Sequence, residues 1–338
     1  MIPRSYEPAR AWLFHRDWAG SANARKIENE KNPNKMARLI TRIAPDVGWL
    51  PVSFANVYFI GRPGGKWVLV DAGMPGRADE ITEAAEARFG AGSRPEAILL
   101  THGHMDHAGS ALALAELWDV SIYAHHLETP YLTGKSVYPP ADPTVGGAIA
   151  FLSRFWPSRS RDLGKCVREL HPGKVPGATG WQWLTTPGHS PGHVSFFRPS
   201  DRVLIAGDAF ATMNMDRWSG LLTGKQMLAR AGSPFTSDWQ AARSSVEELA
   251  DLRPNVIGCG HGLPMCDAEL PARMQSFAER FRAPRYGRYV RRAARTDEDG
   301  IVDLPPAPFD PVPLMTAALL LLTGIALGSG YLDDQNRR

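Results

Sequence analysis

Three histidines and one aspartate occupy positions 102–107, directly after a short apolar run. A buried imidazole needs a hydrogen-bond partner, and adjacent imidazolium charges repel one another. A divalent cation removes both difficulties, because neutral imidazole and carboxylate groups are its ligands. Residues two apart in an extended loop point the same way, so we expect His102 and His104 to share one ion. Asp106 and His107 lie on the turn into a helix, face another direction and would serve a second ion.

Four ligands do not complete two metal sites, so further ligands must come from later in the chain. Three candidates each follow a short hydrophobic strand and stand beside glycine: His189, Asp208 and His261. Ligand sites in α/β sheets lie at strand ends. The repetition of this pattern indicates that the three residues meet the 102–107 cluster at one edge of the fold.

This set resembles the metallo-β-lactamase-fold superfamily of metal-dependent hydrolases, in its glyoxalase II and lactonase-like branch. The resemblance spans about Val52 to His261 and rests on Thr101–His107, His189, Asp208, His261 and the upstream segment Leu69–Gly73. It implies that His102, His104 and His189 hold one ion, that Asp106, His107 and His261 hold the other, and that Asp208 bridges them. It also implies that Asp71 is a supporting carboxylate that fixes the tautomer of a ligand histidine.

The chemistry implied by such a centre is hydrolysis. Two adjacent cations lower the pKa of a bridging water, and the resulting hydroxide attacks a carbonyl or phosphoryl centre. Asp106 is predicted to be catalytic, because it can orient the hydroxide and pass a proton to the leaving group. A nitrogen-rich ligand set without cysteine favours two Zn²⁺ ions, although iron or manganese also fits.

The substrate predicted from the resemblance is a small acyl compound with an ester, thioester or lactone bond. Acyl-homoserine-lactone lactonases carry Tyr three residues after the bridging aspartate, where this chain has Ala211. Glyoxalase II enzymes bind glutathione with residues after the last histidine, whereas Gly262–Met265 offers no cation here. The alternatives left open are a mononuclear iron dioxygenase of the persulfide type, a phosphodiesterase of the same fold, and a binding module without catalysis.

The strands and helices expected from the sequence explain how these ligands could be brought together. Residues 54–60 and 66–70 predict a hairpin, and strands then alternate with helices. We expect strands at 97–101, 120–124, 182–185, 193–197, 203–206 and 255–258, and helices at 79–89, 108–118, 238–252 and 268–281. This order predicts two layers of mixed sheet with outer helices. The family resemblance sharpens the prediction to a four-layer αββα sandwich with metals at one edge.

Composition limits the other possibilities. A net charge of +3 is too mild for nucleic-acid binding. Three cysteines without zinc-finger spacing favour a reducing compartment, and the first residues lack a secretory signal. We expect a hydrolase domain over 1–285 with its core at 48–265, a linker at 286–313, and a hydrophobic C-terminal helix at 314–332.

The uncharged segment 314–332 is nearly long enough to span a bilayer. It predicts a membrane anchor that tethers a cytoplasmic catalytic domain, with packing on the enzyme or on a second copy as the alternative. The oligomeric state is left open.

Overall fold

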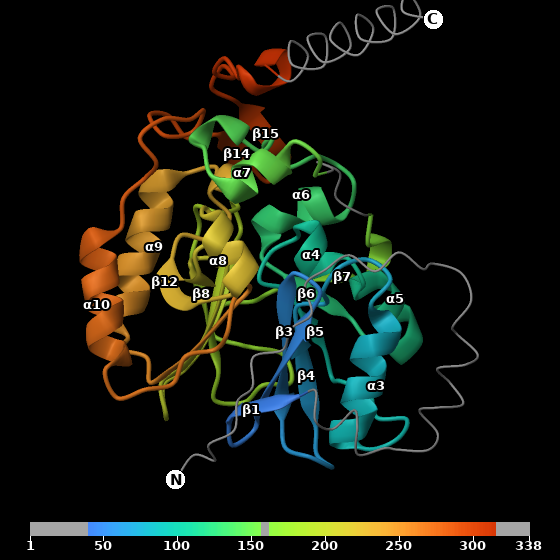
Figure 1. The fold of residues 1–338 in the computed structure, drawn as a ribbon. Coiled ribbons are helices and arrows are strands. Elements are labelled where there is room, and N and C mark those ends of the chain that lie inside the picture. Colours follow the sequence, from blue (N-terminus) through green and yellow to red (C-terminus); the bar gives the residue numbers. More distant parts are fainter. Residues whose placement is uncertain (1–39, 157–161, 316–338) are drawn as a thin grey trace, which may run out of the picture.

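The computed structural model describes residues 40–156 and 162–315, and these form four layers. Figure 1 shows the strands in the middle, with α3 (Ala78–Phe89) and α5 (Ala111–Trp118) on one side and α9 (Trp239–Asp251) and α10 (Leu270–Arg280) on the other. The αββα sandwich predicted from the sequence is therefore confirmed.

The first sheet contains seven strands in sequence order. Its first four strands pair antiparallel, and β4 to β7 pair parallel. The strands are β1 (Thr41–Ala44), β2 (Val47–Val52), β3 (Ala55–Gly61), β4 (Trp67–Val70), β5 (Ile98–Leu99), β6 (Ile122–Ala124) and β7 (Val167–Glu169). Parallel pairing requires crossovers, and α3 and the α4–α5 segment supply two of them.

The second sheet has four strands in the order β13-β10-β9-β8. They are β8 (Gln182–Thr185), β9 (Val194–Arg198), β10 (Val203–Gly207) and β13 (Val256–Cys259). Only the β10–β13 pair is parallel, and α9 makes that crossover. Asp238 caps α9 by accepting hydrogen bonds from two backbone N–H groups.

Alternation along the strands explains why two sheets pack face to face. In β4, Trp67 and Leu69 pack against α3, whereas Val68 and Val70 pack against the second sheet. In β10, Leu204 contacts the α9 side while Ile205 faces the first sheet. Successive side chains of a strand point to opposite faces, so strands buried on both faces read as continuous apolar runs.

The remaining elements are short. Four of the described helices have four to six residues: α4 (Met105–Ala108), α6 (Thr129–Leu132), α7 (Ala148–Ser153) and α8 (Trp218–Thr223). The other elements are the hairpins β11 (Ala211–Met213)–β12 (Gln226–Ala229) and β14 (Arg295–Asp297)–β15 (Gly300–Asp303), and the 3₁₀ turns η1 (His126–Glu128), η2 (Pro143–Val145), η3 (Gly164–Cys166) and η4 (Ser233–Phe235).

Residues 286–313 were expected to form a linker, but they pack on the domain. They contain the β14–β15 hairpin, and Tyr289 is buried with its hydroxyl donating to the Pro140 carbonyl at 2.8 Å. Arg154, directly after α7, donates two hydrogen bonds to the carboxylate of Asp310. The acidic and proline-rich composition was read as a linker because it lacks periodicity, yet single buried side chains hold the segment in place.

The prediction of a membrane-spanning helix at 314–332 is corrected. Within residues 40–156 and 162–315, no helix is long and apolar enough to cross a membrane. A span needs about 20 consecutive helical residues, and only Leu314 and Met315 of the predicted segment belong to the described chain. The rest of the predicted segment lies outside the described residues.

The two sheets approach each other closely at Gly258. A Cβ atom there would lie 2.5 Å from Cε1 of Tyr58, which reaches across from β3. We expect Gly258→Ala to lower the free energy of unfolding by about 1–3 kcal/mol, because overpacking forces the sheets apart. Urea denaturation measures this loss. In a Tyr58→Leu background the same substitution should cost less, and an equal cost in both backgrounds would contradict the explanation.

Candidate metal centre

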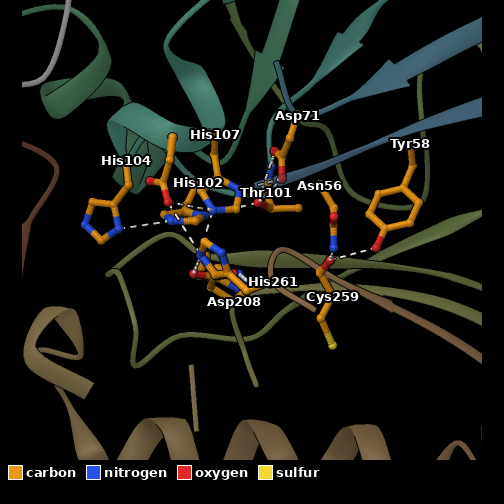
Figure 2. A network of polar contacts seen from close by, with 12 residues as sticks. Asn56, Tyr58, Asp71, Thr101, His102, His104, His107, Asp208, Cys259 and His261 are labelled. Carbon is orange, nitrogen blue, oxygen red and sulfur yellow. Dashed lines mark hydrogen bonds and ion pairs between the residues drawn. The ribbon is translucent and has the colours of Figure 1, made fainter. Parts of the chain in front are cut away.

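The predicted ligands converge between the two sheets (Figure 2). His102 and His104 follow β5, and Asp106 and His107 lie on α4. The second sheet contributes the other three residues: His189 from the β8–β9 loop, Asp208 directly after β10, and His261 after β13. Three overlapping groups result, and within each group the potential ligand atoms lie within 4.8 Å of one another.

One group consists of three imidazoles. His104 Nδ1 lies 3.0 Å from His102 Nε2 and 2.9 Å from His189 Nε2. A neutral imidazole carries one N–H, so three such nitrogens cannot all satisfy one another. Their convergence fits a cation that accepts lone pairs from all three.

The second group combines carboxylates and imidazoles. Asp106 Oδ2 lies 3.5 Å from His261 Nε2 and 3.8 Å from His107 Nε2. Asp208 Oδ2 is shared between the groups. It lies 3.1 Å from His261 Nε2, 3.7 Å from His107 Nε2 and 3.5 Å from His189 Nε2. These positions agree with the assignment of Asp208 as a bridge, which we retain as a proposal.

Unpartnered buried atoms support the fit to metal ions. Asp208 Oδ1 and His107 Nε2 are buried without a hydrogen-bond partner. A buried polar atom without a partner costs free energy, and a buried carboxylate needs compensating positive charge. Divalent cations held among these residues would supply that charge.

Asp71 and Thr101 fix the orientation of two histidines. His107 Nδ1 donates to Asp71 Oδ2 at 2.8 Å, which leaves Nε2 directed at the candidate site. Thr101 donates its hydroxyl to the same carboxylate at 2.8 Å and lies 3.1 Å from His102 Nδ1, so it can accept that N–H. Asp71 adopts a left-handed φ of 61°, a conformation that aspartate tolerates better than most residues. These contacts support the role proposed for Asp71.

The other ligands are also held by hydrogen bonds. His261 Nδ1 donates to the Phe54 carbonyl at 2.7 Å, and Nε2 therefore faces the carboxylates. The backbone N–H of Asp208 donates to His193 Nε2 at 2.8 Å. His193 Nδ1 in turn lies 2.8 Å from the Thr186 hydroxyl. His193 thus positions Asp208 and is not a member of the candidate ligand groups.

Gly260 allows the close approach of Asp208. A Cβ at position 260 would lie 2.0 Å from Asp208 Oδ1 and 2.5 Å from His107 Cε1. No other residue type fits there without moving the carboxylate. Steric exclusion of a Cβ atom therefore explains why glycine precedes His261.

Burial and charge oppose each other across the site. Burial lowers the pKa of His104 to about 4, and burial together with neighbouring histidines lowers the pKa of His102 well below its usual range. Burial also disfavours the charged form of His107, but Asp106, Asp208 and Asp71 outweigh it and raise its pKa to about 10. One group therefore offers neutral imidazoles, and the other concentrates negative charge.

Glu128 was not recognised in the sequence, yet it connects the two loops of the three-histidine group. Its fully buried carboxylate accepts from the Gly103 N–H at 2.9 Å, between His102 and His104. It also accepts from the Ser190 hydroxyl at 2.7 Å and the Gly192 N–H at 2.8 Å, just after His189. The Tyr138 hydroxyl makes a short fourth hydrogen bond to it. No periodicity marks Glu128, because it lies on a 3₁₀ turn.

The fold and the site together define a metal-dependent hydrolase, and comparison with known proteins agrees. The chain belongs to the metallo-beta-lactamase superfamily, whose family model matches residues 50–261. This match begins in β2 and ends at the last candidate ligand. The fold of this superfamily implies divalent metal ions.

Individual relatives place the chain among metallo-hydrolases. It is 43% identical over 241 residues to the probable metallo-hydrolase YflN of Bacillus subtilis (strain 168), covering 70% of this chain and 91% of the relative. It is 28% identical over 221 residues to a hydroxyacylglutathione hydrolase of Acidiphilium cryptum (strain JF-5), covering 65% and 69%. The crystal structure of a beta-lactamase domain protein from Burkholderia ambifaria shares the fold, with 21% identity, a TM-score of 0.51 and coverage of 71% and 72%.

Replacement of Glu128 tests its connecting role. Glu128→Gln removes one acceptor oxygen while four donors still face the position. We expect the affinity of the variant for the ion of the three-histidine group to fall about 10–100-fold, the usual effect of losing such support. Competition with a chelator measures this affinity. Glu169→Gln on β7 changes an exposed acid and is the matched control. Equal metal affinities in the two variants would contradict the connecting role of Glu128.

Acid sensitivity of the metal-free protein tests the buried state of His193. Burial lowers its pKa to about 3, so it stays neutral in the fold and gains a proton on unfolding below about pH 6.5. Stability is therefore lost as the pH falls from about 6.5 towards 3, with a slope of about 1.4 kcal/mol per pH unit from this group. Urea denaturation with chelator present measures the slope. His193→Gln should reduce it by this amount, and the exposed His171→Gln should not.

Proposed function

We propose that this protein hydrolyses an ester, thioester or lactone bond with two divalent cations bound between the sheets. The observation that carries the proposal is the position of Asp208 Oδ2, within 3.1–3.7 Å of ring nitrogens from both ligand groups. His102, His104 and His189 would hold one cation, and Asp106, His107 and His261 the other, with Asp208 between them. Zn²⁺ is the metal proposed, because imidazole and carboxylate ligands suit it.

The cations supply acidified water and a polarised carbonyl when they are bound. The side chains of the protein would position the cations and transfer the proton. Asp106 is the more accessible of the two carboxylates, because its side chain is 14% exposed whereas that of Asp208 is 3% exposed. Asp106 Oδ2 can therefore accept a proton from the attacking water and deliver it to the leaving group.

A carbonyl substrate is favoured over a phosphoryl substrate by the charges around the site. Within the described residues, no lysine or arginine forms an ion pair or hydrogen bond with any of the seven proposed ligands. Phosphoryl-transfer sites commonly add such cations. The named activity of the Acidiphilium relative, hydroxyacylglutathione hydrolase, also belongs to acyl chemistry.

A mononuclear iron dioxygenase would use only two histidines and one carboxylate. The second group here, with Asp106, His107 and His261, provides three further donors that such an enzyme does not need. Metal analysis separates the two functions. Two zinc ions per chain and no oxygen consumption are expected, whereas one iron with oxygen consumption would overturn the proposal.

Asp208→Ala should lower metal content and activity together, because it removes the shared ligand. Mass spectrometry of metals and a panel of thioester, lactone and phosphodiester substrates measure the two quantities. Activity that persists after both metals are lost would contradict this mechanism.

Asp106→Asn keeps a ligand oxygen but removes the proton acceptor. We expect it to retain more metal than Asp208→Ala and to lose about 10²-fold or more in kcat. Measuring kcat per bound metal separates the two effects. An unchanged kcat per metal would exclude Asp106 as the proton carrier.

A further inference from the structure

Three aromatic side chains, Phe235, Trp156 and Phe54, form a continuous row beside the proposed metal ligands. We call them the aromatic row. The Phe235 ring lies 5.8 Å from the His104 ring, Trp156 lies 6.3 Å from Phe235, and Phe54 lies 6.1 Å from Trp156. The row ends at Phe54, whose carbonyl accepts the hydrogen bond from His261. It therefore begins at a ligand of one group and ends beside a ligand of the other.

The backbone holds the row against the site. Phe235 belongs to η4, and the residues that follow η4 donate two backbone hydrogen bonds to the Gly188 carbonyl, at 2.9 and 3.0 Å. Gly188 directly precedes His189. A Cβ on Gly232, at the start of η4, would lie 3.3 Å from His189 Cε1. The position of Phe235 is thus fixed by the loop that carries a proposed ligand.

The row is not part of the hydrophobic core. Phe54 is 57% exposed, and Phe235 and Trp156 are only half-buried. Phe155, the chain neighbour of Trp156, belongs to an apolar patch with Phe151, Trp218 and Leu222, and Phe155 and Leu222 are each 76% exposed. The Phe151 ring contacts both Phe155 and Trp218. Contiguous exposed apolar surface usually marks a ligand or interaction site.

The cationic residues closest in sequence to Trp156 and Phe235, within the described residues, are paired with carboxylates. Arg154, two residues before Trp156, is bonded to Asp310 at 2.8 Å. Arg230, five residues before Phe235, is bonded to Asp216 at 2.8 Å. Within the described residues these are the nearest cations in sequence to the two rings, so neither is free to bind an anionic group of a substrate.

We infer that the aromatic row binds the uncharged, apolar acyl chain of the substrate, which extends from the metal centre towards the apolar patch. This inference rests on the proposed hydrolytic function and names its substrate class. A carbonyl carbon held at the metal centre would place the chain along Phe235 and Trp156, where each buried methylene group is removed from water. The chain would also exclude water from the reacting carbonyl. A short or anionic acyl group gains neither effect.

A series of p-nitrophenyl esters tests the inference with the metal-loaded full chain. We expect kcat/KM for the octanoate to exceed that for the acetate by roughly tenfold or more. The butyrate should exceed the monoester of succinate, which has the same number of carbons but carries a charge, by a similar factor. Equal values within either pair would overturn the inference.

Variants of the aromatic row test whether its side chains cause the preference for the longer acyl chain. Trp156→Ala and Phe235→Ala should each reduce the octanoate-to-acetate ratio about fivefold. Leu117→Ala is the matched control, because it removes a 60% exposed leucine on α5 and should keep the ratio of the wild type. If both row variants keep the ratio as the control does, the chain does not lie on the row. Circular dichroism confirms that each variant is folded.

A binding measurement separates this inference from the proposed function. The uncharged fluorophore N-phenyl-1-naphthylamine should bind the wild type and be displaced by octanamide, and both affinities should fall in Trp156→Ala. If this occurs while no ester is hydrolysed, the hydrolytic proposal fails but the row remains an apolar binding site. If esters are hydrolysed without binding of the fluorophore or the amide, the inference fails alone.

A second copy of the chain is the competing occupant of the apolar patch. Sedimentation velocity of the wild type and of the double variant Phe155→Ala/Trp218→Ala tests whether a second copy binds there. A dimer that the double substitution dissociates, with no change in the octanoate-to-acetate ratio, would assign the patch to self-association and overturn the inference. A sedimentation coefficient that is the same in both proteins excludes self-association through the patch and leaves the substrate chain as its occupant.

Discussion

The buried carboxylate of Asp208 is the constraint around which the structure is arranged. It is 3% exposed, and its Oδ2 lies near imidazoles that come from both sheets. A carboxylate in such a place is tolerable only when positive charge surrounds it. His261 and His107 provide that charge in the metal-free chain, and they hold the pKa of Asp208 well below its usual range despite the opposing effect of burial. Metal ions would provide the same compensation while freeing those imidazoles to act as ligands.

Support for this carboxylate extends through several residues that are not ligands. The His193 ring holds the Asp208 backbone, and Gly260 leaves room for its oxygen. Asp71, in a left-handed conformation, orders Thr101 and His107. Strained backbone is commonly retained where function requires a particular geometry. The site is therefore built from rigid strand ends, and its histidines have little freedom to rotate.

The strand and helix patterns predicted two layers of mixed sheet, and the family resemblance predicted the four-layer sandwich and the set of seven proposed ligands. The structure brings these seven residues together. The proposed ligands come shortly after strands of the two sheets, and strand ends meet at one edge of a sheet. Glu128 could not be predicted in this way. It lies in a segment rich in proline and glycine, where no periodicity shows which side chains turn inward, and its partners Gly103 and Gly192 contribute only backbone groups.

The sequence predictions that failed also concern segments without clear periodicity. Residues 286–313 were interpreted as a linker from composition, although Tyr289 and the β14–β15 hairpin pack on the domain. The strand β1 was missed because its four residues have mixed exposure and no clear alternation. The membrane helix was inferred only from an uncharged stretch of sequence. The described chain contains no helix that is long and apolar enough to cross a membrane. Local composition says little where a few long-range contacts determine the structure.

The division of the ligands between the two sheets also affects how the protein is made. The segment with His102, His104 and His107 leaves the ribosome early, but His261 follows β13, the last strand of the second sheet in chain order. Neither ligand group is complete in the first sheet alone. A nascent chain therefore cannot assemble the full centre until both halves have docked. Metal uptake would then follow folding, and a truncated or misassembled product would remain without the complete cofactor site and its reactivity.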